Sequence, residues 1–361
     1  MYKILIDHTI FLHQRNGGIS KYFSRLYQVN KKFKNGLSLN IFCPITINEN
    51  LYNIRGLKNL YFFKIKKIPK FCTQLFYFIN NLLFIIYVNI NKPDLLHITY
   101  FNYQITKFTK IPYVLTIHDL IHEKYFKKKV DKEKFKLIHG AKKIICVSHT
   151  TMKDLIKFYK INPTKIKVIH HGVKKKKFLK KKRENFILFV GDRRNYKNFN
   201  LLLNAFSKSN FLKKNFKIIF FGGGKFNEKE LKKLKQLRIY SKVKLLFGDD
   251  DVLNKIYRKS KVLVYPSKYE GFGIPLIEAM INGCAIIAND IQIFREILEK
   301  QIFLFKKNNS INLKNKLEKL LKFKKVYNHN LYEAKKLIKN YDLEKNYLHH
   351  KNLYLDVIEK E

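Results

Sequence analysis

The segment 262–290 constrains the fold of this chain more than any other part of the sequence. Residues 262–265 are β-branched, apolar or aromatic and predict a buried parallel strand, which Pro266 ends. A glycine-containing loop follows, and Pro275 suits the first turn of a helix. The run 285–289 then predicts the next strand. A strand, loop, helix and strand in this order indicate a βαβ unit of an α/β sheet.

Two glutamates lie where such a sheet binds ligands. Glu270 is on the loop after the first strand, and Glu278 is on the opening turns of the helix. The ligand crevice of an open α/β sheet lies beyond the carboxyl ends of its strands. Carboxylates accept hydrogen bonds from sugar hydroxyls, and the loop amides 271–273 with the helix N-terminus would face an anion. Two structural glutamates without a ligand are the alternative that the spacing alone favours, whereas the full strand–loop–helix context favours a nucleotide sugar.

The same segment resembles the signature of the retaining glycosyltransferases of family 4, which have the GT-B fold. The signature residues occur here in order as Glu270, Gly271, Phe272, Gly273, Pro275, Glu278, Ala279 and Gly283. Three further motifs occur in family order, namely GGISKY at 17–22, IHDL at 117–120 and FVGDRRNYKN at 189–198. The resemblance therefore extends over the whole chain.

Length and cysteine usage agree with a two-domain protein of a reducing compartment. A chain of 361 residues with 46% hydrophobic residues is long enough for two domains, each with its own core. The four cysteines are far apart, lie in apolar runs and fit neither a zinc pattern nor a disulfide framework. No signal segment precedes the strand-like start, so we expect no export and a cytoplasmic location.

The formal net charge of +47 raises the question of nucleic acid binding. Lysine supplies most of this charge, and asparagine, isoleucine, phenylalanine and tyrosine are abundant as well. Such a bias spread over the sequence speaks to association and solubility rather than to base recognition. We therefore expect no nucleic acid partner, while attraction to an anionic membrane or to a nucleotide stays open.

The first half of the chain reads as a series of βα units. Residues 2–6 predict a strand, Gly17 and Gly18 a loop, and 19–29 a helix; an ordinary turn is as well supported as a phosphate-facing one. His118 follows the strand 113–117 together with Asp119, at a predicted strand end. Further strands are expected at 37–42, 60–63, 94–98, 143–147 and 165–169, and helices at 131–140 and 149–160.

Residues 71–90 are apolar and about long enough to cross a bilayer. Internal asparagines and a glutamine argue against a span, so a core helix or a helix on the membrane surface is expected. Lys64, Lys66, Lys67 and Lys70 precede it, which favours docking on an anionic leaflet. The charged, aperiodic run 173–185 predicts a linker.

The second half contains a cationic loop between the predicted strand 186–190 and the predicted helix 199–207. Arg193, Arg194 and Lys197 lie on this loop, where they would neutralise a diphosphate; a solvated turn is the alternative in so basic a chain. Further strands are expected at 217–221 and 243–247, and a helix at 291–298. The acidic run 249–251 opens a helix, where its charge suits the helix dipole, and is not placed to hold a metal ion.

The resemblance implies an α/β, GT-B architecture of two Rossmann-like domains facing across a cleft. The domains implied are an acceptor-side domain at 1–172, the linker, a nucleotide-sugar domain at 186–340 and a last helix at 341–361 that returns to the first domain. The implied reaction moves a hexose, mannose among the candidates, from a GDP- or UDP-linked donor. The acceptor would be a glycan or lipid-linked hydroxyl in cell-surface polysaccharide or lipopolysaccharide synthesis.

Roles carry over from the family residue by residue. Glu278 would bind the donor ribose, Glu270 the sugar, and Arg193 and Lys197 the diphosphate, with Arg193 against Arg194 left open because Asp192 intervenes in the pattern. The resemblance places Gly17 and Gly18 near the phosphates, His118 near the transferred sugar, and Gly271, Phe272, Gly273 and Ile274 at the donor. No metal and no cofactor are expected, because cations and helix dipoles can stabilise the leaving group.

Two other classes of function account for part of the sequence. A nucleotide-cofactor oxidoreductase would also show βαβ halves but needs a dinucleotide fingerprint that the sequence lacks. A non-catalytic basic binding module would explain the charge but not the paired glutamates.

Overall fold

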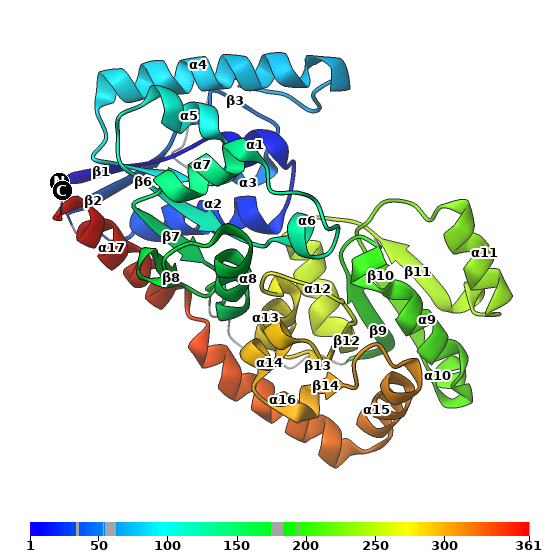
Figure 1. The fold of residues 1–361 in the computed structure, drawn as a ribbon. Coiled ribbons are helices and arrows are strands. Elements are labelled where there is room, and N and C mark those ends of the chain that lie inside the picture. The colour runs from blue at the N-terminus through cyan, green and yellow to red at the C-terminus, as the bar shows by residue number, and fades with distance from the viewer. Residues whose placement is uncertain (34–35, 53, 55–62, 175–182, 194, 361) are drawn as a thin grey trace. The chain divides into compact units, whose positions relative to one another are not determined.

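The computed structural model describes residues 1–360 except 34–35, 53, 55–62, 175–182 and 194 (Figure 1). The chain forms two compact units. The first unit comprises Met1–Gly172 together with Leu343–Glu361, and the second comprises Val173–Asp342. The α/β class expected from the sequence is confirmed in both units.

The first unit is built on a six-stranded parallel sheet with the order β2-β1-β5-β6-β7-β8. Its strands are β1 (Tyr2–Ile6), β2 (Leu37–Ile41), β5 (Leu95–Ile98), β6 (Tyr113–Ile117), β7 (Lys143–Cys146) and β8 (Ile166–Val168). A separate parallel pair consists of β3 (Ile45–Thr46) and β4 (Phe63–Lys64). The strand expected at 60–63 lies outside the described residues except for Phe63, where β4 begins.

Alternation along the strands divides the core of the first unit into two layers. Ile4 and Ile6 belong to the cluster beneath α2 (Gly18–Asn30) and α17 (Leu343–Ile358). Leu5 belongs to the cluster on the other face, which includes side chains of α4 (Thr73–Asn91). The remaining helices of this unit are α1 (Thr9–His13), α3 (Glu49–Tyr52), α5 (Tyr103–Phe108), α6 (Ile121–Lys124), α7 (Lys132–Gly140), α8 (His149–Tyr159), and the 3₁₀ turns η1 (Lys70–Cys72) and η2 (Pro163–Lys165).

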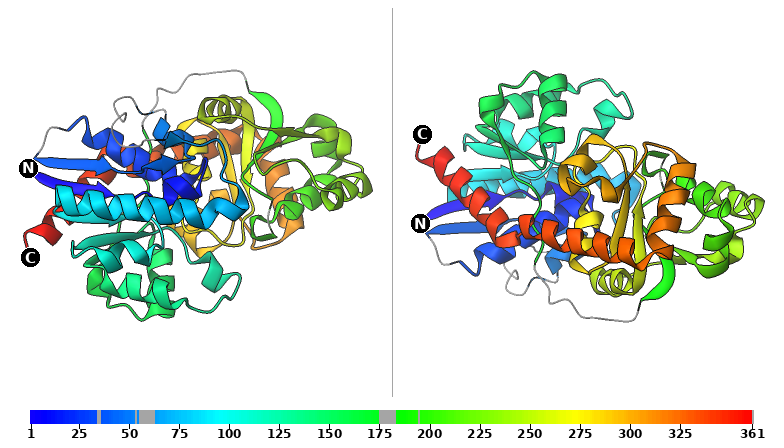
Figure 2. Two further views of the ribbon diagram at one scale, coloured as in Figure 1. Left: turned by 90° about the horizontal axis from the view of Figure 1, so that it is seen from above. Right: turned by 90° about the horizontal axis from the view of Figure 1, so that it is seen from below.

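The helix expected at 71–90 is confirmed as α4, which lies along the outside of the first unit in Figures 1 and 2. It spans 19 residues and contains a segment with a mean hydropathy of 1.4, and among the described residues it alone is long and apolar enough to cross a membrane. Within it, Asn80, Phe84 and Val88 are buried. A core helix would bury most of its surface, so the core-helix alternative is wrong.

The second unit is built on a six-stranded parallel sheet with the order β11-β10-β9-β12-β13-β14. Numbered within the unit, this order is 3-2-1-4-5-6, the doubly wound order in which the connections reverse direction between β9 and β12. The strands are β9 (Glu184–Val190), β10 (Lys217–Phe221), β11 (Val243–Leu246), β12 (Ser260–Tyr265), β13 (Ala285–Asn289) and β14 (Leu304–Phe305).

Helices cover both faces of this sheet. Ile187 and Phe189 of β9 pack in one cluster with α9 and α15, while Leu188 between them is buried on the opposite face. The helices are α9 (Phe199–Ser207), α10 (Asn210–Asn215), α11 (Glu228–Gln236), α12 (Asp250–Lys259), α13 (Ile274–Ile281), α14 (Gln292–Leu298), α15 (Ser310–Lys322) and α16 (Lys324–Leu337). The 3₁₀ turns are η3 (Asn195–Lys197), η4 (Tyr240–Lys242), η5 (Gln301–Phe303) and η6 (Ile338–Asn340).

The segment expected as a linker is structured at both of its ends. Val173 is buried and forms a parallel bridge with Asp342. Arg183 donates to the main-chain carbonyls of Arg258 and Ser260 at 3.2 and 2.8 Å, and β9 begins at Glu184 rather than at 186. A charge run read as solvated thus contains an arginine that ties β9 to its neighbours, and 175–182 lie outside the described residues.

Candidate functional site

Lys197 and Glu270 form an ion pair at the point where the strand order of the second unit reverses. Lys197 ends η3 after β9, and Glu270 lies on the loop after the adjacent strand β12. Lys197 Nζ donates to Glu270 Oε1 at 2.6 Å, and the two side chains are 12% and 13% exposed. Doubly wound sheets bind their ligands at this reversal, so the pair lies where a ligand is expected.

Tyr265 is hydrogen-bonded to the lysine of this pair. Lys197 Nζ also donates to Tyr265 Oη at 3.1 Å. Burial alone would lower the pKa of Lys197, but the charge and hydrogen bond of Glu270 hold this pKa above its ordinary value. Burial and then the charge of Glu270 raise the pKa of Tyr265 well above its usual range. At neutral pH Lys197 is therefore an ammonium and Tyr265 a neutral phenol.

The loop after β12 reaches α13 through a backbone conformation that requires glycine. Gly273 is the N-cap of α13 with φ 116°, and a Cβ on it would lie 3.1 Å from a ring carbon of Phe294. Pro275 occupies the first turn of the helix, as expected, and Phe272 is buried with its ring edge-on to Tyr341. Packing against Phe294 and Tyr341 thus fixes Gly273 and Phe272 in the turn that leads into α13.

Glu278 lies on α13 and is partly exposed. Tyr257 Oη of α12 donates to its Oε2 at 3.4 Å. The tyrosine is fully buried, and burial followed by the charge of Glu278 raises its pKa well above the usual range. The side chain of Glu278 is therefore oriented by a hydrogen bond from a neutral phenol.

A glycine-rich turn after β10 lies beside the loop that carries Lys197. Residues 222–224 follow β10, and Gly223 has φ 79°. A Cβ on Gly223 would lie 2.9 Å from the Cα of Asp192, so the turn after β10 lies against the loop after β9. The loops after β9 and β10 are consequently packed as one surface.

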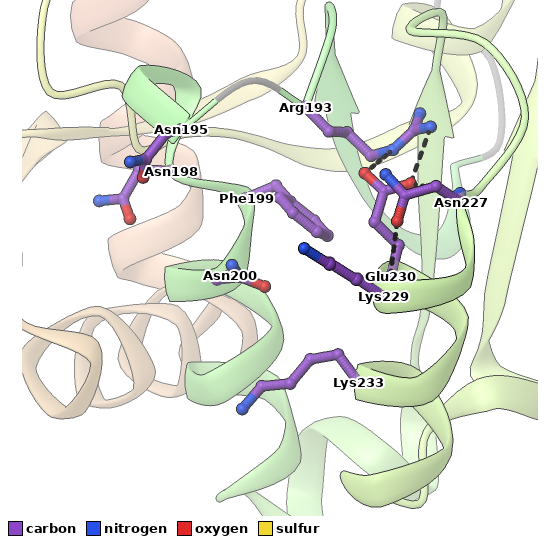
Figure 3. A pocket seen from close by; sticks show the side chains of 9 residues that line it. All are labelled: Arg193, Asn195, Asn198, Phe199, Asn200, Asn227, Lys229, Glu230 and Lys233. Atoms are coloured by element: carbon purple, nitrogen blue, oxygen red, sulfur yellow. Dashed lines mark hydrogen bonds and ion pairs between the residues drawn. The ribbon is translucent and has the colours of Figure 1, made fainter.

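Arg193 does not join Lys197 at Glu270. Its Nε donates to Glu230 Oε1 at 2.9 Å (Figure 3). Its guanidinium also donates to the carbonyls of Gly222, Gly224 and Lys225 at 3.1, 3.0 and 2.9 Å. The side chains of Arg193 and Glu230 are 3% and 10% exposed. An arginine whose donors bind protein oxygens in this way fixes the fold of the two loops, so the prediction that it holds a diphosphate needs correction.

A polar pocket of about 420 Å³ lies beside Arg193, between the start of α9 and α11. Lys229 and Lys233 extend from α11 into the space opposite Asn200 (Figure 3). Of the predicted site residues that the structure describes, Arg193 alone lines this pocket. The pocket is therefore distinct from the Lys197–Glu270 pair.

The predicted residues of the first unit lie at a helix start and at a strand end. Gly17 is the N-cap of α2, and Gly18 is the first residue of that helix. His118 follows β6 and is 8% exposed. Its ring is stacked on that of His171, with 5.7 Å between the ring centroids. Its Nε2 has no hydrogen-bond partner among the described residues. The roles expected for these three residues at a donor stay predictions.

Buried histidines of the first unit are neutral at physiological pH. Burial, followed by the charge of His350, lowers the pKa of His118 to about 3. Burial also lowers the pKa of His8 to about 3 and that of His350 to about 4, and holds the pKa values of His97 and His171 well below the usual range. His118 can accordingly exchange hydrogen bonds with a hydroxyl but does not supply a positive charge.

Acidification is expected to destabilise the protein already at pH values well above those at which carboxylates titrate. Between pH about 6.5 and the lowered pKa values, the unfolded chain binds protons that the folded chain does not, so stability rises with pH there. On acidification below pH about 6.5, each of the five histidines can remove up to about 1.4 kcal/mol per pH unit. Urea unfolding midpoints at pH 7.5, about 6 and about 5 would measure this loss. A constant midpoint over this range would contradict the burial of neutral imidazoles.

The described residues contain no group of three or more histidine, cysteine, aspartate or glutamate side chains suited to hold a metal ion. The acidic run 249–251 opens a helix as expected: Asp249 is the N-cap of α12 and accepts from the amides of Asp251 and Val252. The Asp249 carboxylate is thus engaged in capping.

Three site residues were missed in the sequence. Tyr265 and Tyr257 orient Lys197 and Glu278, but a tyrosine at a strand end or in an amphipathic helix carries no local signal of such a role. Glu230 had a signal, because Asn227 and Glu230 form a capping box at the start of α11. The pattern N-x-x-E would have predicted the cap, but not that its carboxylate also binds Arg193.

Two family models match the chain. The model described as "Glycosyl transferases group 1" matches residues 172–337, and the model described as "Glycosyltransferase Family 4" matches 17–177. Together they extend over both units, and the first contains Lys197, Glu270 and Glu278.

Curated relatives match over part of their length. The chain is 32% identical over 194 residues to the O-antigen chain mannosyltransferase RfbU of Salmonella typhimurium, covering 51% of this chain and 54% of the relative. It is 30% identical over 149 residues to an N-acetylgalactosaminyltransferase of Campylobacter jejuni that acts on a diphospho-undecaprenol substrate, covering 40% of each chain. The matches thus span about half or less of these relatives.

Solved structures match over the full length. A glycosyltransferase of Rickettsia africae has a TM-score of 0.76 at 19% identity, covering 100% of this chain and 99% of that chain. Anabaena HepE in complex with UDP and glucose also has a TM-score of 0.76, at 14% identity, covering 99% and 100%. At these identities the likeness establishes a shared fold.

Proposed function

Because the chain belongs to the family 4 glycosyltransferases and has their GT-B fold, we propose that it transfers a hexose from a nucleoside diphosphate sugar to a glycan or lipid-linked acceptor. The relatives support this proposal: RfbU is named for O-antigen chain mannosyl transfer, and the Campylobacter enzyme for a diphospho-undecaprenol acceptor. Mannose, a GDP- or UDP-linked donor and a role in cell-surface polysaccharide synthesis are the specific forms that we propose. No observation in the structure favours an oxidoreductase or a non-catalytic basic module.

The single observation that carries the proposal is the buried Lys197–Glu270 pair at the reversal of the strand order. When the glycosidic bond breaks, its electron pair moves to the leaving diphosphate, which gains negative charge. An ammonium fixed before the reaction stabilises that charge without reorganisation. Glu270 in turn orients Lys197 and accepts a hydrogen bond from a hydroxyl of the transferred sugar.

We propose that transfer retains the anomeric configuration, as the family resemblance implies, and that it needs no metal ion. Support for metal independence comes from Lys197, whose raised pKa keeps it cationic, and from the N-terminus of α13 at the same loop. With Arg193 bound to Glu230, we propose Arg194, the alternative that the sequence left open, as the second cation for the diphosphate, although it lies outside the described residues. We place the reaction in the reducing cytoplasm, which the four free thiols of the chain support.

Replacing Glu278 with alanine is expected to weaken donor binding rather than to change the chemical step. In the proposed complex its carboxylate accepts hydrogen bonds from the ribose, and a hydrogen bond to a charged group contributes about 1.5–3 kcal/mol. The dissociation constant for the nucleoside diphosphate should therefore rise about 10- to 100-fold. Isothermal titration with GDP and UDP would measure it.

Glu278→Gln and Tyr257→Phe are the matched controls for this variant. Glutamine keeps one acceptor oxygen without the charge, and phenylalanine removes the phenol that orients the carboxylate. Both should give intermediate affinities. Affinity equal to that of the wild type in a folded Glu278→Ala protein would remove Glu278 from the donor site.

The function itself is tested by a donor screen. Thermal unfolding in the presence of GDP- and UDP-linked hexoses should identify the donor, because a ligand that binds the native state raises its stability. Transfer is then followed as release of the nucleoside diphosphate with lipid-linked and soluble glycan acceptors. A protein that binds and cleaves none of these donors would overturn the proposal.

A further inference from the structure

The outer face of α4 is a continuous apolar stripe, although this helix lies on the surface of the first unit. The stripe consists of Phe71 just before the helix and Leu75, Phe78, Leu82, Ile86 and Ile90 within it, which are 88, 56, 64, 47, 45 and 74% exposed. Their spacing of three or four residues places them on one side of a helix. A continuous exposed apolar surface of this kind marks a site that binds a partner or a membrane.

The inner face of α4 is fixed to the first unit by polar contacts. Asn80 Oδ1 accepts from the amide of Ile45 at 2.9 Å, and Asn80 Nδ2 donates to the Ile45 carbonyl at 2.8 Å. Asn102 Nδ2 donates to Asn81 Oδ1 at 2.8 Å, and Phe84 is fully buried. A helix that crossed a bilayer would leave these contacts, so the partner or membrane must meet α4 from one side.

The sequence around the stripe carries positive charge only. Lys64, Lys66 and Lys67 precede it and are exposed, and Lys92 follows it. Residues 63–92 contain no aspartate or glutamate. Lysines beside an apolar helix face are attracted to anionic lipid headgroups, whereas two copies of this surface would repel each other.

We propose that α4 docks the first unit on an anionic lipid bilayer, lying in the plane of the membrane with its apolar stripe inserted at the headgroup–acyl boundary. The stripe follows a helix about 28 Å long, which suits an interfacial helix. The lysines contact lipid phosphates, and the inner face keeps its contacts to β3. The bilayer is the one partner that matches both a uniform apolar stripe and flanking cations.

Docking also places the membrane beside an edge of the sheet of the first unit. Tyr77 of α4 has its Oη 3.2 Å from Nδ1 of His13, which ends α1. Helix α1 begins shortly after the carboxyl end of β1, where ligands of such sheets bind. If the proposed function holds, a lipid-linked acceptor would reach this edge without leaving the bilayer; this step alone depends on the proposed function.

Vesicle flotation tests the docking. The full chain is mixed with vesicles of phosphatidylcholine alone or with phosphatidylglycerol, at low and at high salt. The wild type should float with the anionic vesicles at low salt and much less at high salt, because screening weakens the lysine contacts. A protein that stays in solution with anionic vesicles at low salt would overturn the proposal.

Two variants separate the apolar and the charged contributions. Leu75, Phe78, Leu82 and Ile86 are changed together to glutamine, and in a second protein Lys64, Lys66 and Lys67 are changed to glutamine. Each is expected to lower the partition coefficient about tenfold or more. The matched controls Ile311, Phe323 and Tyr332 to glutamine, and Lys232, Lys235 and Lys244 to glutamine, change exposed residues of the second unit and should bind as the wild type does.

Further measurements test whether something other than a bilayer binds the apolar stripe. Light scattering that showed a dimer in the wild type and a monomer in the α4 glutamine variant would replace the bilayer with a second copy of the chain. Circular dichroism confirms that each variant is folded before its binding is interpreted. If controls and α4 variants bound vesicles equally, general basicity rather than α4 would account for the binding.

The experiments can contradict the membrane docking without contradicting the proposed reaction, and the reverse. Transfer to a soluble acceptor should be unchanged in the α4 glutamine variant, while transfer to a lipid-linked acceptor in vesicles should fall with its binding. Vesicle binding without any transferase activity would leave the docking standing and remove only the reaction.

Discussion

Lys197→Met is expected to lower kcat by about 10²- to 10³-fold, the loss found when one fixed donor to a developing negative charge is removed. Methionine fills a similar volume without an ammonium, so the leaving diphosphate would lose the cation that the structure fixes 2.6 Å from Glu270. The measurement is the steady-state rate of nucleoside diphosphate release at saturating donor and acceptor. Because the change acts on the departing group, kcat should fall more than donor affinity.

The double variant Lys197→Met with Glu270→Gln separates catalysis from folding. The single change leaves a carboxylate that is 13% exposed without its cation, which costs stability, whereas the double change removes both charges. Stability should therefore recover in the double variant while activity does not. Activity that a chelator abolishes and magnesium or manganese restores would show that a metal ion, and not Lys197, stabilises the leaving group.

Arg193→Met is expected to lower the free energy of unfolding by about 3–5 kcal/mol, as when one partner of a buried ion pair is lost. The change leaves Glu230 charged and 10% exposed without its partner, and three main-chain carbonyls lose their donor. Urea unfolding would measure the loss. The second change Glu230→Gln should restore part of it, because glutamine can keep the cap of α11 without the charge.

Arg194→Met is the matched comparison. We expect it to weaken donor binding, whereas the change at Arg193 is expected to lower stability. If Arg193→Met left stability unchanged and weakened donor binding instead, Arg193 would bind the diphosphate.

The sequence predicted the elements that depend on local patterns. Strands 2–6, 113–117, 217–221 and 285–289 are present as expected, because short runs made mostly of apolar and β-branched residues in a βα series strongly favour strands. Glu270 and Lys197 were assigned to one site from strand-end positions, and their ion pair agrees with that reading. Parallel strands gather their carboxyl ends at one edge, so this inference needs topology but no side-chain detail.

What failed depends on contacts between residues distant in sequence. Arg193 and Lys197 look alike on a cationic loop, yet one turns to Glu230 on α11 and the other to Glu270. Arg183 lies within a lysine run, and only its carbonyl partners distinguish it from solvated neighbours. The exposure of α4 could not be decided either, because an apolar helix has the same sequence in a core as on a bilayer.

The position of α17 has a consequence for how the protein is made. Its residues Tyr347, Leu353 and Tyr354 complete the core that Ile4 and Phe23 begin, although the whole second unit separates them in the chain. A ribosome therefore delivers the last part of the first core after every residue of the second unit. Until then the cavity for α17 stays open, so on each nascent chain the second unit is able to mature before the first.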